Sequence, residues 1–161
     1  MSDLLNPTAR KIQATLDQLG YKCKVIEFQE TTRTSADAAA RVECTLGQIV
    51  KSLIFRGRIS GKPFLILTSG ANRVDTRKIT SLIGEKIERA DPEFVRSCTG
   101  FAIGGIPPIG HLSSIDTIMD EDLLTYDFLW AAAGTPNAVF KLSPQELLTM
   151  SSAKIASVKE V

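Results

Sequence analysis

The residue with the clearest chemical potential is Lys51, which stands inside the apolar run between Ile49 and Phe55. Side chains alternate between the two faces of a strand, so Lys51 would point the same way as Leu53 and Phe55. Burying an ammonium is costly unless the charge is paired or reaches a wet cleft. A rim position, where the stem covers apolar surface and the charged head reaches water, is an equally good interpretation. The pattern therefore indicates either a functional cation or a lysine at the edge of the sheet.

A second feature is the stretch 100–111, which is rich in glycine and proline and ends in the chain's single histidine. Glycine permits close backbone approach and unusual dihedral angles, whereas consecutive prolines stiffen the chain and donate no backbone hydrogen bond. Such a loop can aim its few remaining N–H groups at one oxygen, as an oxyanion hole or a phosphate-binding nest does. A structural turn would have the same composition. The stretch matches neither the Walker nor the dinucleotide-binding fingerprint.

His111 and the three cysteines are further residues whose side chains could take part in chemistry. His111 could titrate near neutral pH or hydrogen-bond a substrate, although a single loop histidine is usually solvated. Cys23, Cys44 and Cys98 form no CxxC pair, so the sequence predicts neither disulfides nor a metal site. A thiol hydrolase built on Cys98 and His111 is an alternative. No serine-hydrolase or zinc-hydrolase motif is present, and we expect no metal and no cofactor.

Charge is unevenly distributed along a chain whose formal net charge is +1. Residues 51–96 contain ten Lys or Arg and five Asp or Glu, so this middle region is basic and the remainder is acidic. A locally basic surface favours a partner with a few phosphates over long duplex nucleic acid, although a solvated mixed-charge surface has the same composition. No apolar window is long enough for a membrane span, and the N-terminus lacks a signal-peptide pattern. We therefore expect a cytoplasmic protein with no membrane contact.

Helices and strands interleave irregularly along the chain. Several helices are expected to begin at capping residues, such as Asn6 before Pro7 and Ser143 before Pro144. We expect helices over 7–19, 34–43, 75–84, 91–98 and from 144, a helical turn over 120–124, and strands over 23–28, 48–56, 63–68, 114–118, 128–133, 138–142 and 154–158. A length of 161 residues without internal repeats fits one domain. A hairpin between the second and third strands favours a mixed α/β sheet over a strictly parallel one.

Three features together resemble the YbaK family: Lys51 in its strand, a GxxxP loop at Gly104–Pro108, and the final turn, strand, Leu142-Ser143-Pro144 and helix. This family includes the freestanding aminoacyl-tRNA deacylases and the editing domain of bacterial prolyl-tRNA synthetases. The order and spacing of the three motifs, over nearly the whole chain, carry the resemblance. It implies an α/β fold in which residues 1–161 form one editing domain, with a mixed, curved central sheet surrounded by helices.

The resemblance also implies a reaction, hydrolysis of the ester that joins an amino acid to the terminal adenosine of tRNA. A water would attack with help from a ribose hydroxyl of the substrate, so no protein nucleophile is needed. Lys51 would hold the terminal nucleotide or its phosphate, and N–H groups around Gly104 and Gly105 would stabilise the carbonyl oxygen as it gains charge. The remaining positions implied to bind substrate are Ser52, Ile106, Pro107, Pro108 and His111, with Pro108 stiffening the loop.

The implied partners are the acceptor end of an aminoacyl-tRNA, with tRNA(Pro) as the leading candidate, and an aminoacyl-tRNA synthetase. Family members that act on cysteinyl-tRNA usually carry an aspartate in the strand before the L-x-P segment, where this chain has Val139. The difference argues against cysteine and leaves alanine, serine, threonine or another small residue. The second alternative is a non-catalytic module that only binds an acceptor end or a nucleotide.

Overall fold

The computed structural model describes residues 5–29 and 34–161, so residues 1–4 of the N-terminus considered above lie outside it. Helices, 3-10 helices (η) and strands alternate along these residues. In chain order they are α1 (Pro7–Gln18), β1 (Val25–Glu27), α2 (Ser35–Val42), η2 (Leu46–Gln48), β2 (Val50–Gly57), β3 (Pro63–Ser69), α3 (Thr76–Ile83), β4 (Ile87–Arg89), α4 (Pro92–Thr99), β5 (Asp116–Asp120), η3 (Glu121–Thr125), β6 (Leu129–Ala132), β7 (Ala138–Leu142), α5 (Pro144–Ser151) and β8 (Lys154–Ala156).

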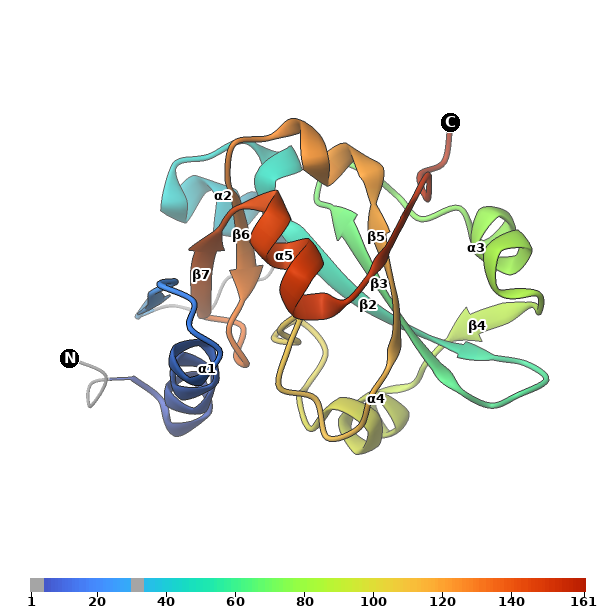
Figure 1. The fold of residues 1–161 in the computed structure, drawn as a ribbon, viewed down its shortest axis with the longest axis horizontal. Helices are drawn as coiled ribbons and strands as arrows, with labels where there is room; N and C mark the ends of the chain where they lie inside the picture. The colour runs from blue at the N-terminus through green and yellow to red at the C-terminus, as the bar shows by residue number, and fades with distance from the viewer. Residues whose placement is uncertain (1–4, 30–33) are drawn as a thin grey trace.

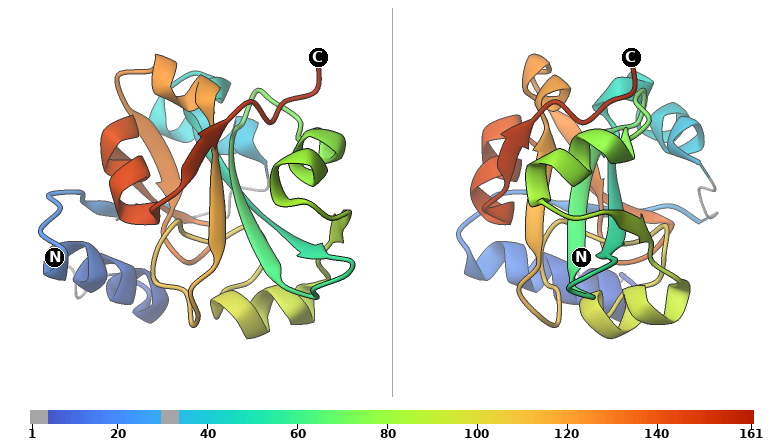
Figure 2. Two further views of the ribbon diagram at one scale, coloured as in Figure 1. Left: turned by 45° about the vertical axis from the view of Figure 1, so that its right-hand side comes forward. Right: turned by 90° about the vertical axis from the view of Figure 1, so that its right-hand side faces the viewer.

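The described strands form two sheets, a five-stranded sheet of order β4-β2-β3-β5-β8 and a three-stranded sheet of order β1-β7-β6. β2 pairs antiparallel with β3, whereas β5 pairs parallel with β3 and β8, so the larger sheet is mixed. The sheets meet where Ile49, just before β2, bridges to Trp130 in β6. Figures 1 and 2 show α1 and α4 at one end of the molecule and α2 at the other. The predicted mixed α/β class is confirmed, with its strands divided between two sheets.

The helices begin where the sequence predicts because their signals are local. The Asn6 side chain accepts from the Thr8 N–H at 2.9 Å and caps α1, which has proline at its first position. In α5, Ser143 and Glu146 satisfy each other's backbone N–H groups in a capping box. Such caps depend only on residues two or three positions apart, so a single sequence reveals them.

Some strand boundaries differ from those expected. β4 was not predicted, because it has three residues of which only Ile87 is buried, too few to show alternation. β2 begins at Val50 rather than Gln48, because Leu46–Gln48 forms a 3-10 turn in which the Gln48 side chain accepts from the Thr45 N–H. β5 spans Asp116–Asp120 rather than 114–118.

β2 separates two clusters of buried apolar side chains, and this alternation places Lys51. Val50 and Ile54 belong to the larger cluster, which includes Leu16 of α1. Phe55 belongs to a second cluster with Ile79 of α3 on the other face. Lys51 therefore lies on the Phe55 face, as predicted, at the start of β2, close to the place where the sheets meet. In the described part of the chain, no helix has the length and hydropathy that crossing a membrane requires.

Candidate functional site

Lys51 and the glycine–proline loop meet at one small cavity of about 240 Å³, hereafter the Lys51 cavity. The start of β2 forms one wall and the segment Ile103–Ile106 forms another. β6, the turn after it, the start of β7 and the start of α2 form the remaining sides, with small or apolar side chains such as Ala38, Ala131 and Val139. The structure thus brings together two stretches some fifty residues apart around a space suited to a small group.

The Lys51 side chain is half-buried, and its Nζ donates a hydrogen bond to the Asn72 carbonyl at 2.6 Å. Burial and the nearby Arg73 charge lower the pKa of Lys51 below its ordinary value, an effect that the Asp120 carboxylate opposes. Within residues 5–29 and 34–161, no carboxylate lies at ion-pair distance from Lys51. An ammonium carries three N–H donors, so two of them stay available to a ligand.

Gly104 and Gly105 have different roles in the loop. Gly105 donates to Ala102 O at 3.1 Å and accepts from Gly134 N at 2.9 Å, which ties the loop to the β6–β7 turn. A Cβ on Gly105 would lie 2.8 Å from Thr135 Cα, so only glycine fits there. Gly104 has a φ of +94°, and the N–H groups of Gly104 and Ile106 have no partner among the described residues. The backbone donors that stay available at this wall of the cavity, in the described protein, are therefore those of Gly104 and Ile106.

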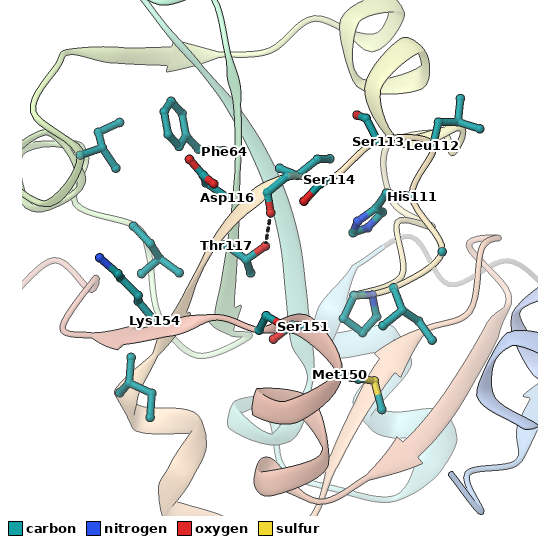
Figure 3. A pocket seen from close by; sticks show the side chains of 18 of the residues that line it. Phe64, His111, Leu112, Ser113, Ser114, Asp116, Thr117, Met150, Ser151 and Lys154 are labelled. Carbon is teal, nitrogen blue, oxygen red and sulfur yellow. Dashed lines mark hydrogen bonds between the residues drawn. The ribbon is translucent and has the colours of Figure 1, made fainter. Parts of the chain in front are cut away.

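Pro107, Pro108 and His111 do not line the Lys51 cavity. Pro108 and His111 line a separate, larger cavity of about 880 Å³, shown in Figure 3. His111 Nε2 lies 2.7 Å from the Pro107 carbonyl, which can only accept, so this nitrogen carries the proton. Burial lowers the pKa of His111, and the bond to Pro107 partly opposes the shift. The hydrogen bond between His111 and Pro107 thus joins two parts of the loop, next to the segment of Gly104 and Ile106 that lines the Lys51 cavity.

Two polar atoms beside the Lys51 cavity lack hydrogen-bond partners among the described residues, Ser52 Oγ and Trp130 Nε1. Leaving a buried polar group unpaired costs about 1–3 kcal/mol, so two such atoms at one place set it apart from ordinary core. Ser52 was predicted from the sequence. Trp130 was not, because its position depends on the long-range bridge to Ile49, which no local pattern reveals.

The structure does not form the pair that a thiol hydrolase needs. His111 Nε2 is occupied by Pro107, and the hydrogen-bond contact of the Cys98 thiol is Ser97 Oγ at 3.9 Å. The buried Cys23 thiol contacts Glu146 at 3.7 Å, and burial together with this carboxylate raises its pKa to about 11. A thiol with so high a pKa is a poor nucleophile at neutral pH. In the described ranges, no three His, Cys, Asp or Glu side chains cluster as metal ligands.

Comparison with known proteins places these features in one family. The family model described as "Aminoacyl-tRNA editing domain" matches residues 29–150, which include every residue that lines the Lys51 cavity. The uncharacterized protein YwhH of Bacillus subtilis is 29% identical and covers 91% of this chain and 92% of its own length.

Two further relatives carry functional names. EbsC of Enterococcus faecalis, provisionally named as a Cys-tRNA(Pro)/Cys-tRNA(Cys) deacylase, is 24% identical over 86% of this chain and 84% of its own. A solved structure provisionally described as a trans-editing enzyme for prolyl-tRNA synthetase has a TM-score of 0.93 and 47% identity, over 98% of this chain and 99% of that one. The first name refers to tRNA(Pro) and tRNA(Cys), and the second refers to prolyl-tRNA synthetase.

Proposed function

Because the chain belongs to the aminoacyl-tRNA editing domain family, we propose that it is a freestanding hydrolase that removes small, wrongly attached amino acids from tRNA in trans, with tRNA(Pro) as the leading substrate. The observation that carries this proposal is the convergence of Lys51 and the Gly104 loop on one small cavity. An aminoacyl-tRNA synthetase would be a further partner. Residues 1–161 would form a single editing domain, working in the cytoplasm where tRNA is charged.

Lys51 would hold the terminal adenosine or its phosphate and so orient the ester. A water adds to the ester carbonyl, whose oxygen takes up negative charge and accepts from the N–H groups of Gly104 and Ile106. The bond from the carbonyl carbon to the ribose oxygen then breaks. The proton from the water ends on the ribose, and the products are a free amino acid and uncharged tRNA. An aminoacyl ester is already labile, so positioning and oxyanion stabilisation suffice without a strong general base.

The cavity supports a small substrate side chain, because its volume is about 240 Å³ and alanines form much of its wall. Val139 lines it, at the position where the resemblance places an aspartate in deacylases of cysteinyl-tRNA. Alanine, serine and threonine therefore suit this chain better than cysteine. An apolar pocket discriminates by only about 1–3 kcal/mol per methylene, so recognition of the tRNA would contribute to selectivity.

Pro107, Pro108 and His111 would contribute by holding the loop rather than by touching the amino acid. All three lie behind the segment that reaches the cavity, and the His111–Pro107 bond of 2.7 Å fixes the turn. Ser52 remains in the binding set, because it lines the cavity and its hydroxyl has no partner in the described protein.

A panel of mischarged tRNAs, incubated with the wild type and with Lys51→Ala, tests the proposal. We expect the wild type to hydrolyse alanyl-, seryl- or threonyl-tRNA(Pro) and Lys51→Ala to hydrolyse none at a comparable rate. Saturable tRNA binding with no deacylation of any species would instead establish the non-catalytic binding module. Loss of activity in Cys98→Ser would support the thiol hydrolase, whereas the proposed mechanism predicts no effect.

A further inference from the structure

Asp120, at the end of β5, is a fully buried carboxylate close to Lys51 but outside its cavity. Its Oδ2 accepts three hydrogen bonds, from Thr68 Oγ1 at 3.0 Å, from Ser69 N at 3.0 Å and from Asn72 Nδ2 at 2.8 Å. A buried charge is costly unless it is paired and hydrogen-bonded. The Asp120 carboxylate is stabilised mainly by hydrogen bonds from these neutral donors. Such an arrangement is expensive to build for packing alone, which points to a positional role.

Asn72 is the residue that connects this carboxylate to Lys51. Its side-chain nitrogen lies 2.8 Å from Asp120 Oδ2 and 2.8 Å from Asp122 Oδ2, so two carboxylates hold one amide. Its backbone carbonyl is the acceptor for Lys51 Nζ at 2.6 Å. An uncharged amide suits this place, because its two N–H donors can bind both carboxylates while the backbone carbonyl of the same residue accepts from the ammonium.

The C-terminal segment holds the residues that follow Asn72. Arg73 O accepts from Glu160 N at 2.8 Å, and Asp75 N donates to Val158 O at 2.7 Å. Lys159 also pairs with Asp122 across 2.9 Å. The backbone that offers the Asn72 carbonyl is therefore fixed from both sides, by the buried carboxylate and by the chain's last residues.

We propose that Asn72 is a positioning residue, whose amide, clamped between Asp120 and Asp122, fixes the carbonyl that orients the Lys51 ammonium toward the substrate. A lysine side chain has considerable rotamer freedom, and one short hydrogen bond removes much of it before substrate binds. The role of Asn72 in catalysis rests on the proposed function, but the anchoring of the ammonium can be tested without it.

The charges around Lys51 support this arrangement. Arg73, exposed on the same segment, lowers the pKa of Lys51, and Asp120 raises it. Hydrogen bonds from Asn72 and Lys159 lower the pKa of Asp122. This carboxylate therefore stays ionised and continues to accept the hydrogen bond from the Asn72 side-chain amide. The Lys51 ammonium is thus opposed by one nearby cation, Arg73, and favoured by one nearby carboxylate, Asp120.

The test compares Asn72→Ala with Gln13→Ala. Gln13 is a matched control, because its half-buried amide also makes several hydrogen bonds, including 3.0 Å to Cys23 O and 2.7 Å from Val25 N, but lies on α1. We expect Asn72→Ala to lower kcat between about 10- and 100-fold with KM changed by less than about 2-fold, because misplacement of a catalytic group acts on kcat. Gln13→Ala should lower the melting temperature and keep the wild-type kcat.

A second measurement is independent of activity. An anchored ammonium exchanges its protons slowly enough for a resolved ¹H–¹⁵N NMR signal, which Lys51→Ala assigns. We expect this signal in the wild type and in Gln13→Ala, and its loss in Asn72→Ala. Asp122→Asn, a change at a partly exposed residue, should weaken the signal and reduce kcat less than Asn72→Ala does. This variant replaces Asn72→Ala in the test if Asn72→Ala does not fold.

A persistent signal, or a fall in kcat no larger than that in the control, would overturn the positioning role. If the wild type deacylates no tRNA while the signal depends on Asn72, the proposed function fails and the anchoring of Lys51 stands.

Discussion

The Lys51 cavity and the larger cavity beside His111 differ in a way that volume does not capture. The larger one, about 880 Å³ in volume, lies between the end of α5 and the loop that follows His111 (Figure 3). Polar groups along it bond within the protein, as Thr117 does to Ile115 O at 2.9 Å and His111 does to Pro107 O at 2.7 Å. The Lys51 cavity is smaller, about 240 Å³, yet it is lined by a half-buried lysine and by two residues with a buried polar atom that has no partner in the described part of the chain.

Unmet hydrogen-bonding capacity, more than size, therefore sets the Lys51 cavity apart from the larger one. A side chain whose donors and acceptors are already satisfied gains little from a ligand. A ligand that pairs with Ser52 Oγ and Trp130 Nε1, which have no partner in the described protein, would recover part of the cost of leaving them unpaired.

The largest expected effect comes from removing the cation. Lys51→Met keeps the stem but removes the ammonium, and we expect kcat/KM to fall by about 10²–10³, as when one oxyanion donor is lost. Lys154→Met is the matched change at the larger cavity and should leave deacylation unaltered. Equal losses in the two variants, measured as initial deacylation rates with circular dichroism to verify folding, would remove the distinction between the cavities.

The next effect separates the two glycines of the loop. Gly105→Ala places a Cβ within 2.8 Å of Thr135 backbone, so the loop must move away from the β6–β7 turn. We expect kcat to fall between about 10- and 100-fold, because this movement displaces the N–H groups of Gly104 and Ile106. Gly104→Ala has open space around its Cβ and should mainly lose stability, on the order of 1–2 kcal/mol for its positive φ. Wild-type kcat in Gly105→Ala would contradict the assigned geometry.

The sequence identifies these glycines as special but not which of their N–H groups are free. Composition alone predicts a stiff loop, and the YbaK resemblance places it beside Lys51. The occupation of the Gly105 N–H by Ala102, and the way His111 turns back to Pro107, depend on three-dimensional closure of the loop. Neighbouring positions in sequence therefore face two different cavities.

A similar limit applies to the fold. The starts of capped helices such as α1 and α5 agree with the sequence-based expectation, because caps are local. The short strand β4 and the Asn72–Asp120 contact were not, since each depends on partners dozens of residues away. The sequence predicts a helical turn that starts at Asp120, and Asp120 caps η3 in the structure. Nothing in the local sequence indicates that its carboxylate is buried.

A smaller effect distinguishes two serines on neighbouring strands. Ser52 Oγ has no partner in the described structure, whereas Ser69 Oγ donates to Gly47 O at 2.7 Å. We expect Ser52→Ala to lower kcat/KM about 5-fold, the value of one lost hydrogen bond, without loss of stability. Ser69→Ala should instead lower the free energy of unfolding by about 1 kcal/mol. Kinetics and denaturant unfolding measure the two effects. A loss of stability in Ser52→Ala together with a loss of activity in Ser69→Ala would show that Ser52 has a packing role.

The smallest effect concerns His111, and it appears in stability rather than in activity. Burial lowers the pKa of His111 below the ordinary histidine value of about 6.5, so the unfolded chain binds this proton more readily than the folded protein. The free energy of unfolding should therefore be fully retained above that value and fall as the pH drops through it. His111→Gln has no titrating ring, and its amide can still donate to the Pro107 carbonyl, so its stability should change less over the same range.

Denaturant unfolding at about pH 7.5 and pH 5.5 measures this difference, since the interval spans the ordinary histidine pKa. Because His111 does not line the Lys51 cavity, His111→Gln should keep a deacylation rate within about 3-fold of the wild type at neutral pH, as expected for a change that touches no reacting group. A large loss of kcat in a variant that is still folded would mean that the loop opens toward His111 when substrate binds. The two cavities would then belong to one site, and the histidine would contact the substrate.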